Sequence, residues 1–105
     1  MGIYPQKIFY KSQDFSFKSL KMNISEDFLS ELGKKISEIR NSNKQTLDDI
    51  EFLTGIDSSD VNKYEQGKIN LTIKTLLKLS IALNVEPKEL IDFKFDYKRY
   101  SNEKS

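Results

Sequence analysis

Three carboxylates in the middle of the chain are the first residues that could do chemistry, because Asp48, Asp49 and Glu51 could together hold a divalent metal ion. On one helix, however, neighbouring side chains point in different directions, and no second cluster completes a site. The chain contains no histidine and no cysteine, which excludes histidine acid–base catalysis, histidine or thiolate metal ligands and a cysteine nucleophile. There is also no glycine-rich phosphate loop. We therefore expect neither an enzyme nor a bound cofactor.

The composition is typical of a single small soluble domain. The 105 residues are 37% hydrophobic and 31% charged, which is a globular balance. A core of this size is small, and such chains often gain stability by forming dimers. No apolar stretch approaches the roughly 20 residues that span a membrane, and no continuous apolar run follows the N-terminal lysines. The expected location is the cytoplasm, without membrane contact.

The net charge of +1 is unevenly distributed along the chain. Residues 1–24 carry a net charge of +3, residues 25–92 carry −4 and residues 93–105 carry +2. We interpret these segments as a basic N-terminal extension, a folded domain and a C-terminal tail. The acidic charge of the domain counts against strong nonspecific affinity for phosphates, because that affinity comes from clustered lysine and arginine.

Apolar residues recur at helical spacing through residues 25–92, which favours an all-α fold of five short helices. The first helix is expected to begin at Ser25, a good N-cap followed by two acidic residues, and to end near Asn41. Its inward face is expected to consist of Phe28, Leu32, Ile36 and Ile39. A fourth helix is expected after Thr72 and a fifth at Pro87. The inward residues of the fourth helix are expected to be Leu76, Leu79 and Leu83.

The second and third predicted helices form a characteristic pair. Thr46 caps the second helix, with an acidic residue three positions later as in a capping box, and Gly55 ends it. Asp57 or Ser58 caps the third helix, which Gly67 stops. Two helices joined by three or four residues that include a glycine are typical of a helix-turn-helix. In that geometry one helix crosses the DNA backbone and the next enters the major groove.

Over roughly residues 30–92 the sequence resembles the Cro/C1-type (XRE-like) helix-turn-helix family of phage repressors. The matching segments are residues 32–40, 50–56, 64–68, 76–85 and 89–90. The resemblance implies a five-helix, lambda-repressor-like domain with N- and C-terminal extensions. It also implies an ion pair between Arg40, near the end of the first helix, and Glu65, near the end of the third.

The resemblance further implies which residues contact double-stranded DNA. Base edges would be read by Ser58, Ser59, Asn62 and Lys63. Phosphates would be held by Thr46, Gln66, Lys68 and Asn70. Three features depart from the family pattern and weaken the expected DNA affinity. Leu47 stands where glutamine is common, Glu51 where a small residue is common, and the third helix carries two aspartates, Asp57 and Asp60.

The two tails contain most of the aromatic residues, and their structure stays open between alternatives. Residues 7–17 could form a short hairpin or a disordered basic arm, and Phe93, Phe95 and Tyr97 alternate as in a strand. We favour packing of these aromatic residues on the domain or on a partner over stacking on bases. The fifth predicted helix, which begins at Pro87, and the C-terminal tail are the first candidates for a dimer surface.

The leading hypothesis is a sequence-specific DNA-binding regulator, acting as a homodimer on a two-fold operator. The sequence does not separate a repressor from a restriction–modification controller or an antitoxin, and an antitoxin would bind its protein partner through the tails. The alternative hypothesis is a protein-interaction module that uses the same fold without operator binding, which the acidic domain supports.

Overall fold

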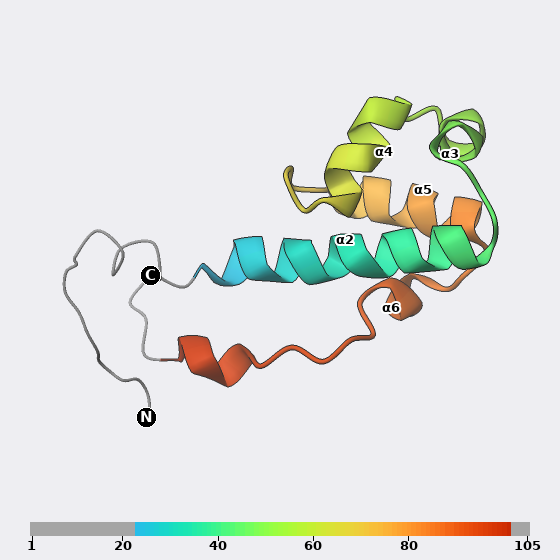
Figure 1. The fold of residues 1–105 in the computed structure, drawn as a ribbon. Helices are drawn as coiled ribbons and strands as arrows, with labels where there is room; N and C mark the ends of the chain where they lie inside the picture. The colour runs from blue at the N-terminus through green and yellow to red at the C-terminus, as the bar shows by residue number, and fades with distance from the viewer. Residues whose placement is uncertain (1–22, 102–105) are drawn as a thin grey trace.

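The computed structural model describes residues 23–101, which form an all-α domain without strands (Figure 1). Its elements are α2 (Ile24–Ser42), α3 (Leu47–Thr54), α4 (Ser58–Glu65), α5 (Ile73–Leu83), α6 (Pro87–Leu90) and the short 3-10 helix η2 (Tyr97–Tyr100). The prediction of five α-helices in the lambda-repressor-like arrangement is confirmed. The alternatives for residues 7–17, a hairpin or an arm, lie outside the described residues.

The first helix begins earlier than the sequence predicts. Its N-cap is Asn23, whose side-chain oxygen accepts a hydrogen bond from the backbone N–H of Glu26 at 3.1 Å. The prediction that Ser25 caps this helix is therefore wrong. Asparagine and serine are equally good caps, and the apolar spacing that begins at Phe28 is compatible with either start.

The threonine caps of α3 and α5 are confirmed. The hydroxyl of Thr46 accepts from the N–H of Asp49 at 3.0 Å, and the Asp49 carboxylate accepts from the N–H of Thr46 at 2.8 Å. The hydroxyl of Thr72 accepts from the N–H of Thr75 at 3.1 Å. Each cap satisfies backbone donors that have no partner within the helix, which typically contributes about 1 kcal/mol.

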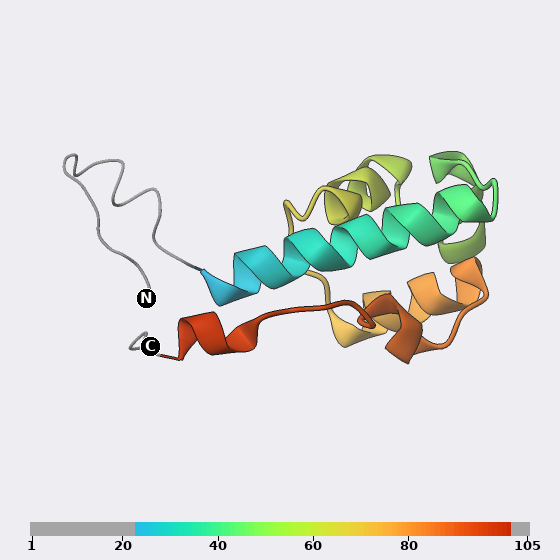
Figure 2. The same ribbon diagram turned by 60° about the horizontal axis from the view of Figure 1, so that its bottom comes forward.

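The long helix α2 packs against α4 and α6, while α3 packs against α4 and α5, and α5 also contacts α6 (Figures 1 and 2). In Figure 1, α3 and α4 lie on one side of α2 and α6 lies on the other. The helices close over a core whose fully buried side chains are Ile36, Ile50, Val61, Leu79, Leu83 and Leu90. Burial of each such side chain contributes about 1.5–3 kcal/mol. The predicted inward residues Leu79 and Leu83 are confirmed, whereas Leu76 is only partly buried.

Two glycines allow the end of α4 to approach α2 closely. A Cβ atom on Gly33 would lie 2.5 Å from the carbonyl oxygen of Tyr64, and a Cβ atom on Gly67 would lie 2.8 Å from the Cα atom of Ser30. Gly67 also has a φ of 70°, in the left-handed region that favours glycine. Backbone therefore packs on backbone where the two helices meet.

The loop between α2 and α3 is fastened to the end of α5. The side-chain amide of Asn43 donates to the carbonyl of Leu83 at 2.9 Å, and that of Gln45 donates to the carbonyl of Ala82 at 3.0 Å. These carbonyls belong to the last turn of α5, where no helical N–H can reach them. The loop thus satisfies the end of α5 while it holds the start of α3 in place.

The segment after α6 folds back along the start of α2. The ring of Phe28 lies 5.0 Å from the rings of both Phe93 and Phe95, and Phe95 stacks on Tyr100 at 5.7 Å. Tyr100 is only 7% exposed, and its hydroxyl donates to the carboxylate of Asp27 at 2.6 Å. The strand considered for this segment is therefore wrong, and its aromatic residues pack on the domain's own first helix.

Candidate nucleic-acid interface

The turn between α3 and α4 is rigidly held. Gly55 has a φ of 78° and its N–H donates to the carbonyl of Glu51 at 2.7 Å, which ends α3. The hydroxyl of Thr54 donates to the carbonyl of Ile50 at 2.7 Å and accepts from the N–H of Ile56 at 3.0 Å. The next helix begins at residue 58. This short, glycine-containing connection has the form of a helix-turn-helix.

The start of α4 is capped by a residue from the preceding helix. The carboxylate of Glu51 accepts a hydrogen bond from the N–H of Ser58 at 3.0 Å. Asp57 occupies the N-cap position but makes no side-chain capping bond. The prediction that Asp57 or Ser58 caps this helix is confirmed for the position, which Asp57 occupies, but the capping hydrogen bond comes from Glu51. A contact across seven residues depends on the geometry of the turn, so spacing alone gives no signal for it.

The acidic cluster considered for metal binding has other roles. Asp49 closes the capping box of α3 and Glu51 caps α4. Within residues 23–101 no group of three or more histidine, cysteine, aspartate or glutamate side chains is arranged to hold a metal ion.

A bidentate ion pair locks α4 to α2. In Arg40 the Nε atom donates to Glu65 Oε2 at 2.6 Å and the Nη2 atom donates to Glu65 Oε1 at 3.0 Å. The remaining Nη1 atom donates to the carbonyl of Gln45 at 2.7 Å, just before α3. The Arg40 and Glu65 side chains are only 12% and 7% exposed. The hydrogen bond to Glu65 raises the pKa of Arg40 against the opposing effect of burial, so the guanidinium stays charged.

The side chains predicted to contact DNA line the start of α3, the exposed side of α4 and the loop that follows it. Residues 59, 62 and 63 of α4 and its C-cap residue 66 are exposed, and their spacing places them on one face of the helix. Val61 is fully buried on the opposite side. Lys68, Asn70 and Thr46 are also exposed, whereas Ser58 is half-buried. The Thr46 hydroxyl and the Ser58 N–H are already engaged in the capping bonds described above.

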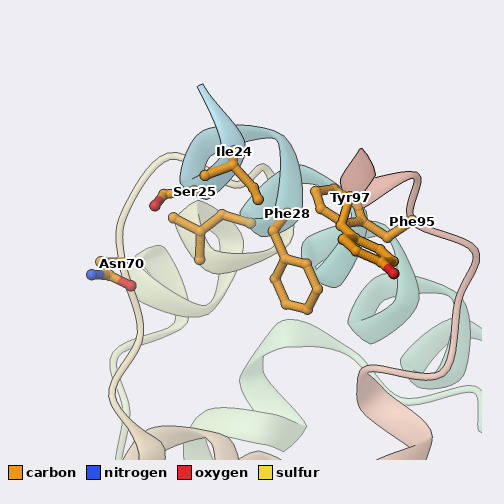
Figure 3. Close-up of a pocket in the computed structure, with 7 residues that line it drawn as sticks. Ile24, Ser25, Phe28, Asn70, Phe95 and Tyr97 are labelled. Atoms are coloured by element: carbon orange, nitrogen blue, oxygen red, sulfur yellow. The ribbon is translucent and has the colours of Figure 1, made fainter. Parts of the chain in front are cut away.

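A concave groove lies between α2 and the C-terminal segment (Figure 3). This groove of about 530 Å³ is lined by Ile24, Ser25, Phe28, Leu29, Asn70, Phe95 and Tyr97. Its lining is mainly apolar and contains no carboxylate and no basic side chain. Among these lining residues the Tyr97 hydroxyl is the one titratable group, so the groove offers no acid–base pair, and the candidate site remains the surface of α4.

A family model described as the helix-turn-helix domain matches residues 33–94, which is more than half of the chain. The chain belongs to this helix-turn-helix family. Its arrangement and motifs are those of the Cro/C1 (XRE-like) type, which comprises DNA-binding transcription regulators. No helix of this helix-turn-helix domain, within the described residues, is long and apolar enough to cross a membrane.

The helix-turn-helix domain is also similar to a solved structure. That structure is the restriction-modification controller protein C.AhdI from Aeromonas hydrophila, with 35% sequence identity and a TM-score of 0.58. The similarity covers 59% of this chain and 94% of that chain. No curated protein sequence matches the chain. The likeness thus extends over part of this chain and nearly the whole of the controller protein.

Proposed function

We propose that the protein is a sequence-specific DNA-binding transcription regulator that acts as a homodimer in the cytoplasm. The observation that carries this proposal is the exposed polar face of α4, presented on a helix that the Arg40–Glu65 pair and two close-packed glycines hold in a fixed orientation. Recognition requires such rigid positioning, because a helix in the major groove must align several side chains with base edges at once. The similarity to a restriction-modification controller favours a controller or repressor role over that of an antitoxin.

The first test is binding to DNA. Fluorescence anisotropy against a pool of random duplexes at two salt concentrations, followed by selection of bound sequences, should recover a two-fold symmetric site. Its half-sites should lie about 10 base pairs apart, one helical turn. Lys63→Ala should weaken binding to the selected site by about 10- to 100-fold and relax the preference at one position, as expected for a lost base contact. Lys68→Ala should instead weaken binding to all sequences and reduce the salt dependence by about one ion.

A matched control for these variants is Lys88→Ala, since that side chain is 81% exposed on α6. Removal of this lysine should leave the affinity for DNA unchanged. Equal affinities for the wild-type protein and all three variants would contradict the assignment of α4 and its following loop as the DNA surface.

The homodimer is supported by an apolar stripe on α5. Ile73, Leu77 and Ile81 recur every four residues and are 70%, 44% and 80% exposed. Two copies that cross about a two-fold axis with their α5 helices antiparallel would bury both stripes. The same pairing brings Lys74, at the start of one α5, towards Glu86, just beyond the end of the other.

Ile81→Glu should therefore convert the dimer to a monomer, because the new carboxylates would face an apolar surface across the two-fold axis. Sedimentation velocity at micromolar concentration measures the change. Phe52→Glu is the matched control, since Phe52 is 87% exposed on α3 and lies outside the stripe. A wild-type monomer, or an Ile81→Glu variant that remains dimeric, would contradict this interface.

A second candidate function is a protein-interaction module that does not bind an operator. It is favoured by the exposed Phe52 and by the acidic residues Asp57 and Asp60 near the start of α4. For such a module Lys63 and Lys68 would be dispensable, and no duplex would bind even at low salt.

A further inference from the structure

Glu51 occupies an unusual place for a carboxylate, at the N-terminus of the helix that we propose enters the major groove. Its Oε1 atom accepts the hydrogen bond from the N–H of Ser58, the first residue of α4. Its Oε2 atom makes no hydrogen bond to any residue between 23 and 101, and the side chain is exposed. The carboxylate therefore satisfies the backbone N–H of Ser58 and also places negative charge at the N-terminal end of α4.

The tip of a helix is normally attractive to phosphate. Free N–H groups point out of the first turn and the helix dipole places partial positive charge there, so anions bind readily. In this protein the Glu51 carboxylate accepts a hydrogen bond from one of these N–H groups, and its negative charge offsets the positive end of the dipole. The carboxylates of Asp57 and Asp60 lie in the same turn and add to the negative charge.

The positive side chains lie at the other end of α4. Lys63 stands in the last turn of the helix and Lys68 in the loop beyond it, and both are exposed. The helix thus repels phosphates at its start and attracts them at its end. Base edges differ from phosphates in this respect, because the amino groups of cytosine and adenine can donate to a carboxylate.

We propose that Glu51 is a specificity-determining residue, which caps α4 from the preceding helix and keeps phosphates away from the helix tip. This inference rests on the proposed DNA-binding function. It separates two effects of one side chain. The hydrogen bond to Ser58 positions the start of α4. The charge weakens complexes in which the helix tip meets a phosphate, but not the operator complex, in which the tip meets base edges, and so it widens the difference in affinity between the operator and other sequences.

Two variants separate these effects. Glu51→Gln keeps an oxygen that can accept from Ser58 but removes the charge, whereas Glu51→Ala removes both. With Glu51→Gln we expect affinity for random duplex to rise by roughly threefold to tenfold at low salt, as one repulsion between exposed unit charges is lost. The ratio of operator to random-duplex affinity should fall by a similar factor, and the gain should shrink at high salt. Anisotropy titrations with both duplexes measure these quantities.

The positioning effect has its own readout, which needs no DNA. The backbone amide resonance of Ser58 in a ¹⁵N-labelled protein should shift and exchange faster with solvent in Glu51→Ala, and Glu51→Gln should largely restore it. Asp92→Asn provides the matched loss of one charge, two residues after α6 and outside the α3–α4 turn. It should leave the Ser58 resonance and both DNA affinities unchanged.

The outcomes distinguish this inference from the proposed function. If the wild-type protein binds its selected site but Glu51→Gln has the same ratio of operator to random-duplex affinity, the role of Glu51 in specificity is overturned and DNA binding stands. A ratio changed equally by Asp92→Asn would reduce the effect to net charge and also overturn it. If the wild-type protein binds no duplex at low salt, the proposed function and this inference both fail.

Discussion

Gly33→Ala should destabilise the domain by about 3 kcal/mol, a large part of the roughly 5–15 kcal/mol by which small proteins are stable. The new Cβ atom would lie 2.5 Å from the Tyr64 carbonyl oxygen and closer still to that of Glu65. These are backbone atoms, so α4 as a whole must move away from α2. Alanine gains only about 1 kcal/mol in helix propensity over glycine, which does not offset this overlap. Urea denaturation followed by circular dichroism measures the loss.

Gly55→Ala is the informative comparison for this variant. Gly55 has a φ of 78°, but a Cβ atom there would meet nothing within 4 Å. Its substitution should cost only the strain of a left-handed alanine, about 1–2 kcal/mol. If Gly33→Ala proves as stable as Gly55→Ala or more so, this result would contradict the close approach of α2 and α4 that the structure describes.

Glu65→Gln should destabilise the protein by about 3 kcal/mol, because it leaves the charge of Arg40 largely buried without a carboxylate. Both side chains are shielded from water, so solvent cannot replace the lost partner. Loss of this pair also frees α4, and operator affinity should fall together with stability. Thermal unfolding and anisotropy on the same variant test the two consequences.

The double variant Arg40→Met with Glu65→Leu should recover much of that stability, since apolar side chains of similar size need no charged partner. Glu31→Gln serves as the control for loss of an ion pair. The Lys34–Glu31 pair is 3.5 Å long with side chains 65% and 41% exposed. Its loss should cost no more than about 0.5 kcal/mol. A Glu65→Gln variant as mild as Glu31→Gln would rule out a structural role for the buried pair.

Much of the fold could be predicted because the relevant signals are local. The threonine caps, the glycine that ends α3 and the apolar spacing of α2 and α5 each depend on residues within two turns of one another. The cap of α2 was predicted two residues too late, at Ser25, because spacing does not separate it from Asn23, an equally good cap that only the hydrogen bond to Glu26 identifies.

Contacts made by tertiary structure could not be predicted in this way. The alternation of Phe93, Phe95 and Tyr97 resembles a strand, but their environment is set by Phe28 at the other end of the domain. Likewise, in the sequence Glu51 is only a departure from the family pattern. Its role as a cap depends on the turn, which brings its carboxylate to the N–H of Ser58. The DNA-contact residues remain predictions, because their partner is a second molecule.

The return of the C-terminal segment along α2 has a practical consequence for how this protein can be joined to others. The chain enters the described domain at residue 23 and leaves it at residue 101, and both points lie at the end of α2 remote from α3 (Figures 1 and 2). A fluorescent dye, an affinity tag or a second domain attached at either point would therefore be carried on the same side of the molecule. One fusion partner could be replaced by another at these points without a change to α4.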